Sequence, residues 1–203
     1  MGQRLVFKCV KDGKRFASIY YHWSGYTQSI YYEAAELVAY LRSHGYTGKE
    51  SIETLQKMLL DYLESRGGGA GWGKDDNGRY YEIEEWQKRG VDPKKEISRN
   101  DGLIDITEQG MRNAEYWAEA LEEFNFDDET FTNNEFYHEG RGEFEISDEE
   151  YKRLPKWNDC DGYVGTIKWD DAVDAHKWFE KLPRVDGVIL GVDEEGLLVT
   201  GLE

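Results

Sequence analysis

Reactive side chains are most concentrated in the segment Tyr20-Tyr21-His22-Trp23-Ser24-Gly25-Tyr26. Here His22 could act as a general base and Ser24 as a nucleophile, since a hydroxyl group needs a neighbouring base to attack. No third member of a triad is identifiable, and the Gly-x-Ser-x-Gly motif of many hydrolases is absent. Three interpretations stay open: a hydrolase that uses His22 and Ser24, the wall of a binding pocket, or an aromatic strand end in which His22 bonds the Gln3 side chain.

A second polar segment, Ser98-Arg99-Asn100-Asp101-Gly102, leads into an apolar run. Its Asn-Asp-Gly residues are typical of a tight turn, and a turn alone would explain them. Arg99 adds a guanidinium group that could hold an anionic ligand through two hydrogen bonds or support a neighbouring carboxylate. We therefore predict a ligand-binding corner, able to take a small nucleotide, formed by Arg4, Tyr20, His22, Trp23, Tyr26, Arg99, Asn100 and Asp101.

The formal net charge of −17 is concentrated in one part of the chain. Residues 101–150 contain 17 Asp and Glu against two basic residues, whereas residues 1–66 have a net charge of +2. Such an acidic block repels phosphates and argues against direct binding of nucleic acid. It fits a solvated surface, a divalent-cation site, or a face that binds a basic protein by imitating nucleic acid. For the last of these we expect a partner-binding face of Glu119, Glu122, Glu123, Asp127, Asp128, Glu129, Glu143 and Glu145.

Other classes of site are not indicated. The four histidines are scattered and no CxxC pair occurs, so we expect no structural metal. The Gly-rich segment 66–73 lacks the Ser or Thr that completes a phosphate-binding P-loop, and we expect no cofactor. Two widely separated cysteines, Cys9 and Cys160, indicate reduced thiols in a cytoplasmic protein. No apolar stretch approaches the roughly 18 residues that span a bilayer, so we expect no membrane partner.

The first element that would position the Tyr20–Tyr26 segment is a β-hairpin. Residues 5–10 and 15–23 flank Asp12-Gly13, a dipeptide that favours a type I′ turn. In the simplest register, residues whose numbers sum to 25 face each other, so Leu5 would pair with Tyr20.

Two helices should follow the hairpin and lie against it. Helical spacing of apolar residues runs over about residues 31–44 and again from Ile52 to Gly67, with Thr47 or Ser51 as the cap of the second helix. The Gly-rich segment 66–73 then predicts a flexible loop.

The rest of the chain predicts a mixture of short strands and helices. We expect a strand at residues 103–107, a helical turn at 108–112 and two or three strands within 115–137. A short helix from 147, a better-defined helix from 170 to about 182, and a closing hairpin at 188–201 that joins the central sheet should follow. The fold class is therefore α+β: one domain with a mixed or antiparallel sheet, N- and C-terminal hairpins and helices packed on it. Its parts are the hairpin and helix pair (1–66), a Gly-rich loop and linker (67–100) and an acidic α/β portion (101–203).

Three segments resemble a family of uncharacterised phage and prophage proteins: Met1-Gly2-x-Arg4 before a hairpin, His22-Trp23-Ser24-Gly25-Tyr26, and Ser98 to Ile104. That family opens with Met-Gly-Thr-Arg and has Trp-Asp-Gly-Tyr-Pro after its first hairpin. This chain differs from it at Gln3, Ser24 and Thr27. The resemblance implies a phage setting, and phage proteins commonly bind host machinery, including basic restriction or CRISPR nucleases, or sequester nucleotide signals of host defence.

The sequence thus predicts a non-enzymatic, acidic phage-type protein that binds and inhibits a basic host protein in the host cytosol. A small-molecule or nucleotide-signal binder at the Arg4, His22 and Arg99 corner is the alternative, and a hydrolase at the same corner is the third hypothesis.

Overall fold

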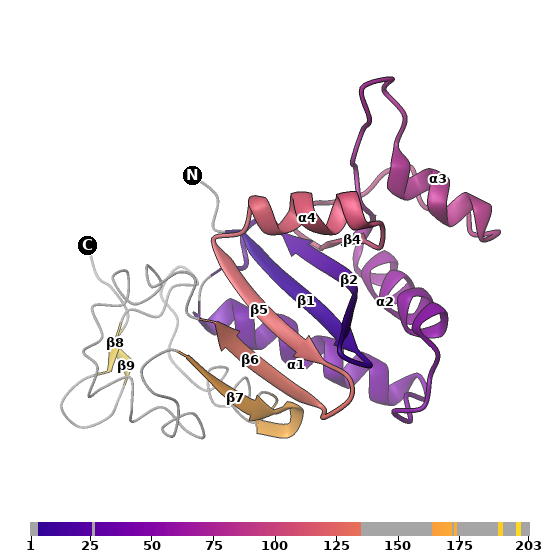
Figure 1. Cartoon of the computed structure of the whole chain (residues 1–203). Helices are drawn as coiled ribbons and strands as arrows, with labels where there is room; N and C mark the ends of the chain where they lie inside the picture. The colour runs from indigo at the N-terminus through magenta and orange to yellow at the C-terminus, as the bar shows by residue number, and fades with distance from the viewer. Residues whose placement is uncertain are drawn as a thin grey trace.

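The protein is built on a seven-stranded mixed sheet with helices on both faces (Figure 1). The computed structural model describes residues 4–25, 27–134 and 164–171, Val173, and two short strands, 191–192 and 198–199. Its helices are α1 (Thr27–Ser43), α2 (Ile52–Arg66), α3 (Tyr81–Lys88) and α4 (Glu108–Tyr116). The strand order is β3 (Gly69–Ala70), β4 (Leu103–Asp105), β2 (Lys14–Tyr21), β1 (Leu5–Lys11), β5 (Ala120–Asn125), β6 (Thr130–Asn134) and β7 (Val164–Lys168). The β1–β5 and β3–β4 pairs are parallel, and the predicted α+β class is confirmed.

The N-terminal hairpin forms as predicted, but its register changes after the turn. Asp12 and Gly13 have φ values of 52° and 65°, as a type I′ turn requires. Val10 pairs with Arg15 in the predicted register, and an irregularity between Cys9 and Val10 then shifts the pairing by one residue. The prediction that Leu5 faces Tyr20 is therefore wrong, because such a bulge places an extra residue on β2 and Leu5 pairs with Tyr21.

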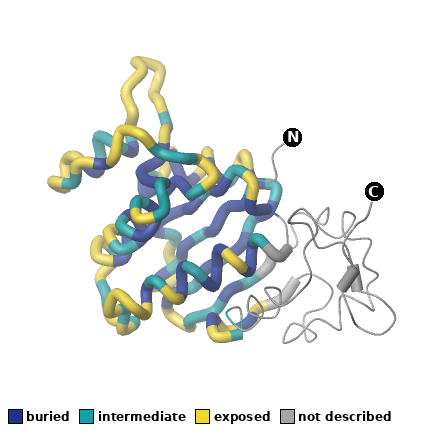
Figure 2. The backbone as a smooth tube through the Cα atoms, turned by 180° about the vertical axis from the view of Figure 1, so that it is seen from behind, coloured by how far each residue is buried: buried dark blue, intermediate teal, exposed yellow. Residues whose placement is uncertain are grey.

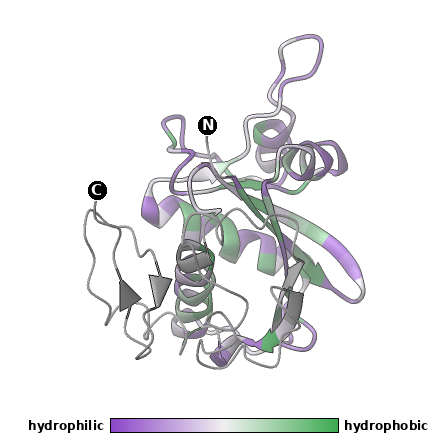
Figure 3. Ribbon diagram, turned by 90° about the vertical axis from the view of Figure 1, so that its left-hand side faces the viewer, coloured by the Kyte–Doolittle hydropathy of each residue, from purple (hydrophilic) through white to green (hydrophobic). Residues whose placement is uncertain are grey.

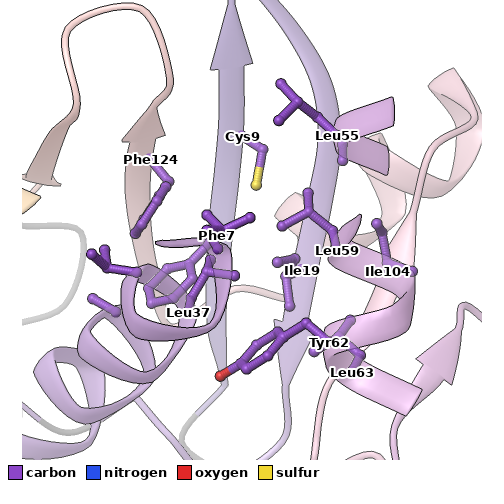
Figure 4. Packing of buried hydrophobic residues seen from close by; sticks show 14 of the residues in the cluster. Phe7, Cys9, Ile19, Leu37, Leu55, Leu59, Tyr62, Leu63, Ile104 and Phe124 are labelled. Atoms are coloured by element: carbon purple, nitrogen blue, oxygen red, sulfur yellow. The ribbon is translucent and has the colours of Figure 1, made fainter. Parts of the chain in front are cut away.

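Helices α1 and α2 cover one face of the sheet and enclose the main core (Figures 2 and 4). Helix α1 starts about four residues earlier than predicted, and Ser51 is the N-cap of α2, accepting a hydrogen bond from the Thr54 amide. Leu37 of α1 and Leu59 of α2 are fully buried against the sheet. Each such side chain contributes about 1.5–3 kcal/mol on burial, so this layer holds the hairpin in place.

Helix α4 lies on the opposite face of the sheet and packs on a smaller apolar cluster, in which Val6 contacts Ala114 and Ala118. Thr107 is its N-cap and accepts a hydrogen bond from the Gly110 amide at 3.0 Å. The prediction of a helical turn at this point is confirmed and extended to Tyr116.

The Gly-rich segment is part of the sheet, so the prediction of a flexible loop throughout 66–73 is wrong. Gly69–Ala70 forms the parallel edge strand β3 beside β4. A Cβ atom on Gly68 would lie 2.1 Å from the Gly102 carbonyl oxygen, so the glycines allow two backbones to approach closely. Beyond them a hydrophilic loop projects from the body and leads to α3 (Figure 3).

Two short strands near the C-terminus pair with each other, as the predicted closing hairpin requires. β8 (Gly191–Val192) and β9 (Leu198–Val199) are antiparallel, but they form a separate two-stranded sheet, which corrects the expectation that they join the central one. The chain is helical at Trp169–Asp171, and most of the helix predicted from residue 170, like the one from 147, lies outside the described residues.

Candidate functional site

A cavity of about 390 Å³ opens on the α4 face of the sheet. Its walls come from the end of β2, the loop before β4, the segment after β3 and helix α4. The residues that line it are Arg4, Tyr20, His22, Trp72, Gly73, Tyr81, Arg99, Leu103, Asp105, Gly110, Asn113, Ala114 and Trp117. The structure therefore brings together Arg4, Tyr20, His22 and Arg99 of the predicted ligand-binding corner.

The other residues of that corner lie elsewhere. Trp23 is 46% exposed and packs edge-on against His22 with ring centroids 5.1 Å apart, outside the cavity lining. Asn100 is exposed in the turn, and Asp101 lies beside the α2 C-cap, where its Oδ2 would be 3.1 Å from a Cβ on Gly67. Tyr26 lies outside the described residues.

His22 ties the strand end to the Arg99 loop. Its amide donates to the Arg99 carbonyl oxygen at 3.1 Å, and its Nδ1 lies 2.8 Å from the Tyr20 hydroxyl. Ser24, the predicted nucleophile, instead donates its hydroxyl hydrogen to Glu33 Oε1 at 3.0 Å. The predicted His22 and Ser24 pair is therefore not formed, because β2 ends at Tyr21 and the strand alternation stops there.

Glu33 belongs to a buried polar cluster between α1 and α2. Its Oε2 accepts a hydrogen bond from Arg66 at 2.5 Å, and Arg66 also donates to the Tyr62 hydroxyl. Burial raises the pKa of Glu33, while the Arg66 hydrogen bond opposes that shift. The Glu33–Arg66 ion pair links α1 to α2, and Ser24 is hydrogen-bonded to this pair. Ser24 therefore has a structural role.

Two arginines at the cavity each lie over a tryptophan ring. The Arg99 guanidinium carbon is 4.0 Å from the centroid of Trp72, and that of Arg4 is 5.6 Å from Trp117. Arg4 is also paired with Glu119 through Nη2 and Oε1 at 2.9 Å. Arg99 has no ion pair with any residue in the described part of the chain, so its charge is available to a ligand.

Asp105 provides a carboxyl group inside the cavity. It is 8% exposed, and within the described ranges no hydrogen bond reaches its side chain. Burial, reinforced by the nearby charge of Glu82, raises its pKa well above the ordinary value of 3.8. An acid shifted by burial and a specific neighbour in a cleft marks a candidate functional residue.

Glu82 of α3 is completely buried next to Asp105 but is well supplied with donors. Its carboxylate accepts hydrogen bonds from the amides of Ile106 at 2.8 Å and Thr107 at 3.1 Å, and from the Thr107 hydroxyl. Burial raises the pKa of Glu82, and these hydrogen bonds lower it. The two carboxyl groups therefore differ in environment: one is solvated by the protein and the other faces the cavity.

Neighbouring glycines make room for both acids. A Cβ on Gly71 would lie 2.0 Å from Asp105 Oδ1, and one on Gly110 would lie 2.1 Å from Glu82 Oε1. The acids thus occupy space that any other residue at these positions would fill.

No protein-family model, no curated protein and no solved structure matches this chain. What the cavity does must therefore be argued from its own residues. No helix in the described part is both long and apolar enough to cross a membrane, and no group of three or more His, Cys, Asp or Glu there could hold a metal ion.

The predicted acidic face is divided in the structure. Glu122 is 2% exposed, so it cannot present its carboxylate to a partner; β5 alternates, and Glu122 points to the same buried side as Phe124. Glu119 pairs with Arg4, and Glu123 lies 4.0 Å from Lys8. Asp127, Asp128 and Glu129 lie in the turn between β5 and β6, while Glu143 and Glu145 lie outside the described residues.

Sequence reasoning missed several residues of the cavity, above all Asp105 and Glu82. Asp105 had a visible signal, because a single acid within the apolar run from Leu103 to Ile106 should be buried with it. Trp72 and Trp117 gave no signal in the sequence, since only the sheet topology brings them to the two arginines.

Proposed function

We propose that this protein binds a small anionic ligand that carries a flat ring, in the cavity between β2, β4 and α4. The observation that carries the proposal is the position of Arg99, which stacks on Trp72 at the cavity. Among the described residues Arg99 has no ion pair, and Asp105 in the same cavity has no hydrogen-bond partner. Guanidinium groups bind phosphates and carboxylates through paired hydrogen bonds.

The size and lining of the cavity support a small ligand. Pockets for such molecules typically measure about 300–1,000 Å³ and combine aromatic walls with a few polar groups. Trp72, Tyr81 and Trp117 supply aromatic surface, and Asn113 supplies an amide. Because Glu119 already neutralises Arg4, the cavity favours a ligand with one anionic group, and a nucleotide meets these requirements.

Binding of a basic host protein through the acidic block stays a prediction, as does the phage setting. It receives less support, because Glu119 and Glu123 face cations of this chain and Glu122 is buried. Among the described acids, the turn at Asp127, Asp128 and Glu129 is where such binding should be tested. We place the ligand-binding activity in the cytosol, where the buried thiol of Cys9 stays reduced.

Thermal unfolding in the presence of ligands tests the proposal. A panel of nucleotides, sugar phosphates and aromatic carboxylates should contain members that raise the unfolding temperature, since a ligand bound only by the folded state stabilises it. Arg99→Ala should lose that increase, and Arg112→Ala, at a guanidinium 68% exposed on α4, should keep it. An increase of the same size in Arg99→Ala would refute the proposed site.

A further inference from the structure

The Asp105 carboxyl lines the cavity and has no hydrogen-bond partner among the described residues. Its Oδ1 lies in a space between Gly71 and Gly110, where a Cβ would approach it to 2.0 and 2.9 Å respectively. Its cross-strand neighbour Ser18 is fully buried and offers it no hydrogen bond in the part of the chain that the structure describes. Buried polar groups are nearly always paired, so the Asp105 carboxyl is a group that a ligand in the cavity can pair with.

The environment of Asp105 favours its neutral, protonated form. Glu82, the adjacent acid, receives three hydrogen bonds from Ile106 and Thr107, and these stabilise its carboxylate form against the effect of burial. Asp105 receives none, is buried, and faces that charge, and these causes raise its pKa. Two adjacent buried carboxyl groups rarely ionise together, and of this pair Asp105 is the one that lacks hydrogen-bond donors among the described residues.

A neutral carboxyl group presents one hydrogen-bond donor beside one acceptor. We propose that Asp105, in its protonated form, recognises the edge of a nucleobase on which an acceptor and a donor are adjacent. Adenine has such an edge in a ring nitrogen next to an amino group, and guanine has one in its carbonyl next to a ring N–H. The proposal rests on the proposed function, because it assigns the ring of the ligand to the Asp105 end of the cavity and leaves the anionic group to Arg99.

Several charged or titratable groups besides Asp105 line the cavity. Tyr81 belongs to α3, and Arg4, Tyr20, His22 and Arg99 form the walls toward β1, β2 and the loop before β4; α4 contributes Gly110, Asn113 and Ala114. Glu82 is buried behind Asp105 and does not line the cavity. Any effect of these groups on binding of the anionic part should be the same for ribose 5-phosphate. Purine riboside 5′-monophosphate keeps the ring, so comparing AMP or GMP with it isolates the contribution of Asp105 from that of the aromatic walls.

Calorimetric titrations between pH 5 and 9 test the inference, with AMP, GMP, purine riboside 5′-monophosphate and ribose 5-phosphate as probes. At the acidic end, AMP or GMP should bind about tenfold more tightly than purine riboside 5′-monophosphate, which keeps the ring but lacks the donor. That advantage should decline as pH rises and Asp105 loses its proton. The preference declines with pH because only the protonated carboxyl of Asp105 can donate a hydrogen bond to the base.

Two substitutions of Asp105 separate this inference from a merely structural role. Asp105→Asn presents an N–H donor beside a carbonyl acceptor, so it should retain the preference for AMP or GMP and lose the pH dependence of that preference. Asp105→Ala should bind AMP, GMP and purine riboside 5′-monophosphate about equally. Thermal unfolding of each variant checks that it is folded.

The outcomes distinguish the two proposals. If no probe binds to the folded wild-type protein, nucleotide binding in this cavity is refuted together with the inference. If ribose 5-phosphate binds as tightly as AMP and GMP, the cavity binds anions as proposed, but Asp105 does not recognise the base and the inference is refuted. Loss of the preference in Asp105→Asn, or a preference for AMP or GMP over purine riboside 5′-monophosphate that increases with pH, would show that an ionised Asp105 is required and would also overturn the inference.

Discussion

Arg4 and Glu119 bind each other through two side-chain hydrogen bonds at the edge of the cavity. Arg4 Nε lies 3.1 Å from Glu119 Oε2, Arg4 Nη2 lies 2.9 Å from Oε1, and the Arg4 amide donates to Oε2 at 2.8 Å. The pair joins the residue before β1 to the residue before β5. The sequence had assigned Arg4 to a ligand and Glu119 to a basic partner, and the structure makes them partners of each other.

A double-mutant cycle on Arg4→Ala and Glu119→Ala should give a coupling energy of about 1 kcal/mol at neutral pH, because the ion pair is partly buried and bidentate. The hydrogen bond from Arg4 lowers the pKa of Glu119 below its ordinary 4.5. The stabilisation is therefore present above pH 4.5 and lost as pH falls through the lowered pKa. Urea unfolding at several pH values measures both. The exposed Arg112–Glu108 pair is the control and should couple by less than about 0.5 kcal/mol. Equal coupling in the two pairs would contradict the role given to Arg4–Glu119.

Asp105→Asn should stabilise the protein at pH 7 by about 1 kcal/mol, as substitutions of functional residues often do. The folded state raises the pKa of Asp105, so its favourable contribution is complete below the ordinary pKa of 3.8 and is lost as pH rises through the raised value. The wild-type protein should therefore lose free energy of unfolding relative to the variant between acidic and neutral pH. Asp92→Asn, at an exposed position, is the control and should change little. A variant less stable than the wild type at pH 7 would show that an ionised Asp105 supports the fold.

Gly110→Ala should destabilise the protein by about 2 kcal/mol, although alanine favours helices more than glycine does. Its methyl group would lie 2.1 Å from Glu82 Oε1 and would displace the acid that holds the start of α4. Gln109→Ala, on the exposed side of the same helix, should change the free energy of unfolding by less than about 0.5 kcal/mol. Chemical denaturation compares the two variants, and a more stable Gly110→Ala protein would mean that the space beside Glu82 is larger than described.

Local signals in the sequence predicted the elements with a strong turn or cap. Asp12-Gly13 predicted the first hairpin and the Ser51 cap predicted α2, because these features depend on neighbouring residues only. Thr107, the cap of α4, was instead assigned to the preceding strand. The register of the hairpin was missed, since nothing in the local pattern marks the bulge at Cys9 and Val10.

The candidate site was predicted in part because four of its residues flank strand ends that meet. Arg4, Tyr20, His22 and Arg99 gather where β1, β2 and the loop before β4 adjoin. Charge counting was less informative, because it cannot separate a buried acid such as Glu122 from a solvated one. Strand alternation with Phe124 would have shown that difference.

Native mass spectrometry of the protein incubated with a small-molecule extract of cells tests the central claim most directly. The wild-type protein should retain an anionic ligand of a few hundred daltons, and so should a variant with Asp127→Lys, Asp128→Lys and Glu129→Lys, whereas Arg99→Ala should lose it. A ligand that stays bound to Arg99→Ala and leaves the lysine variant would contradict the claim that the cavity is the binding site.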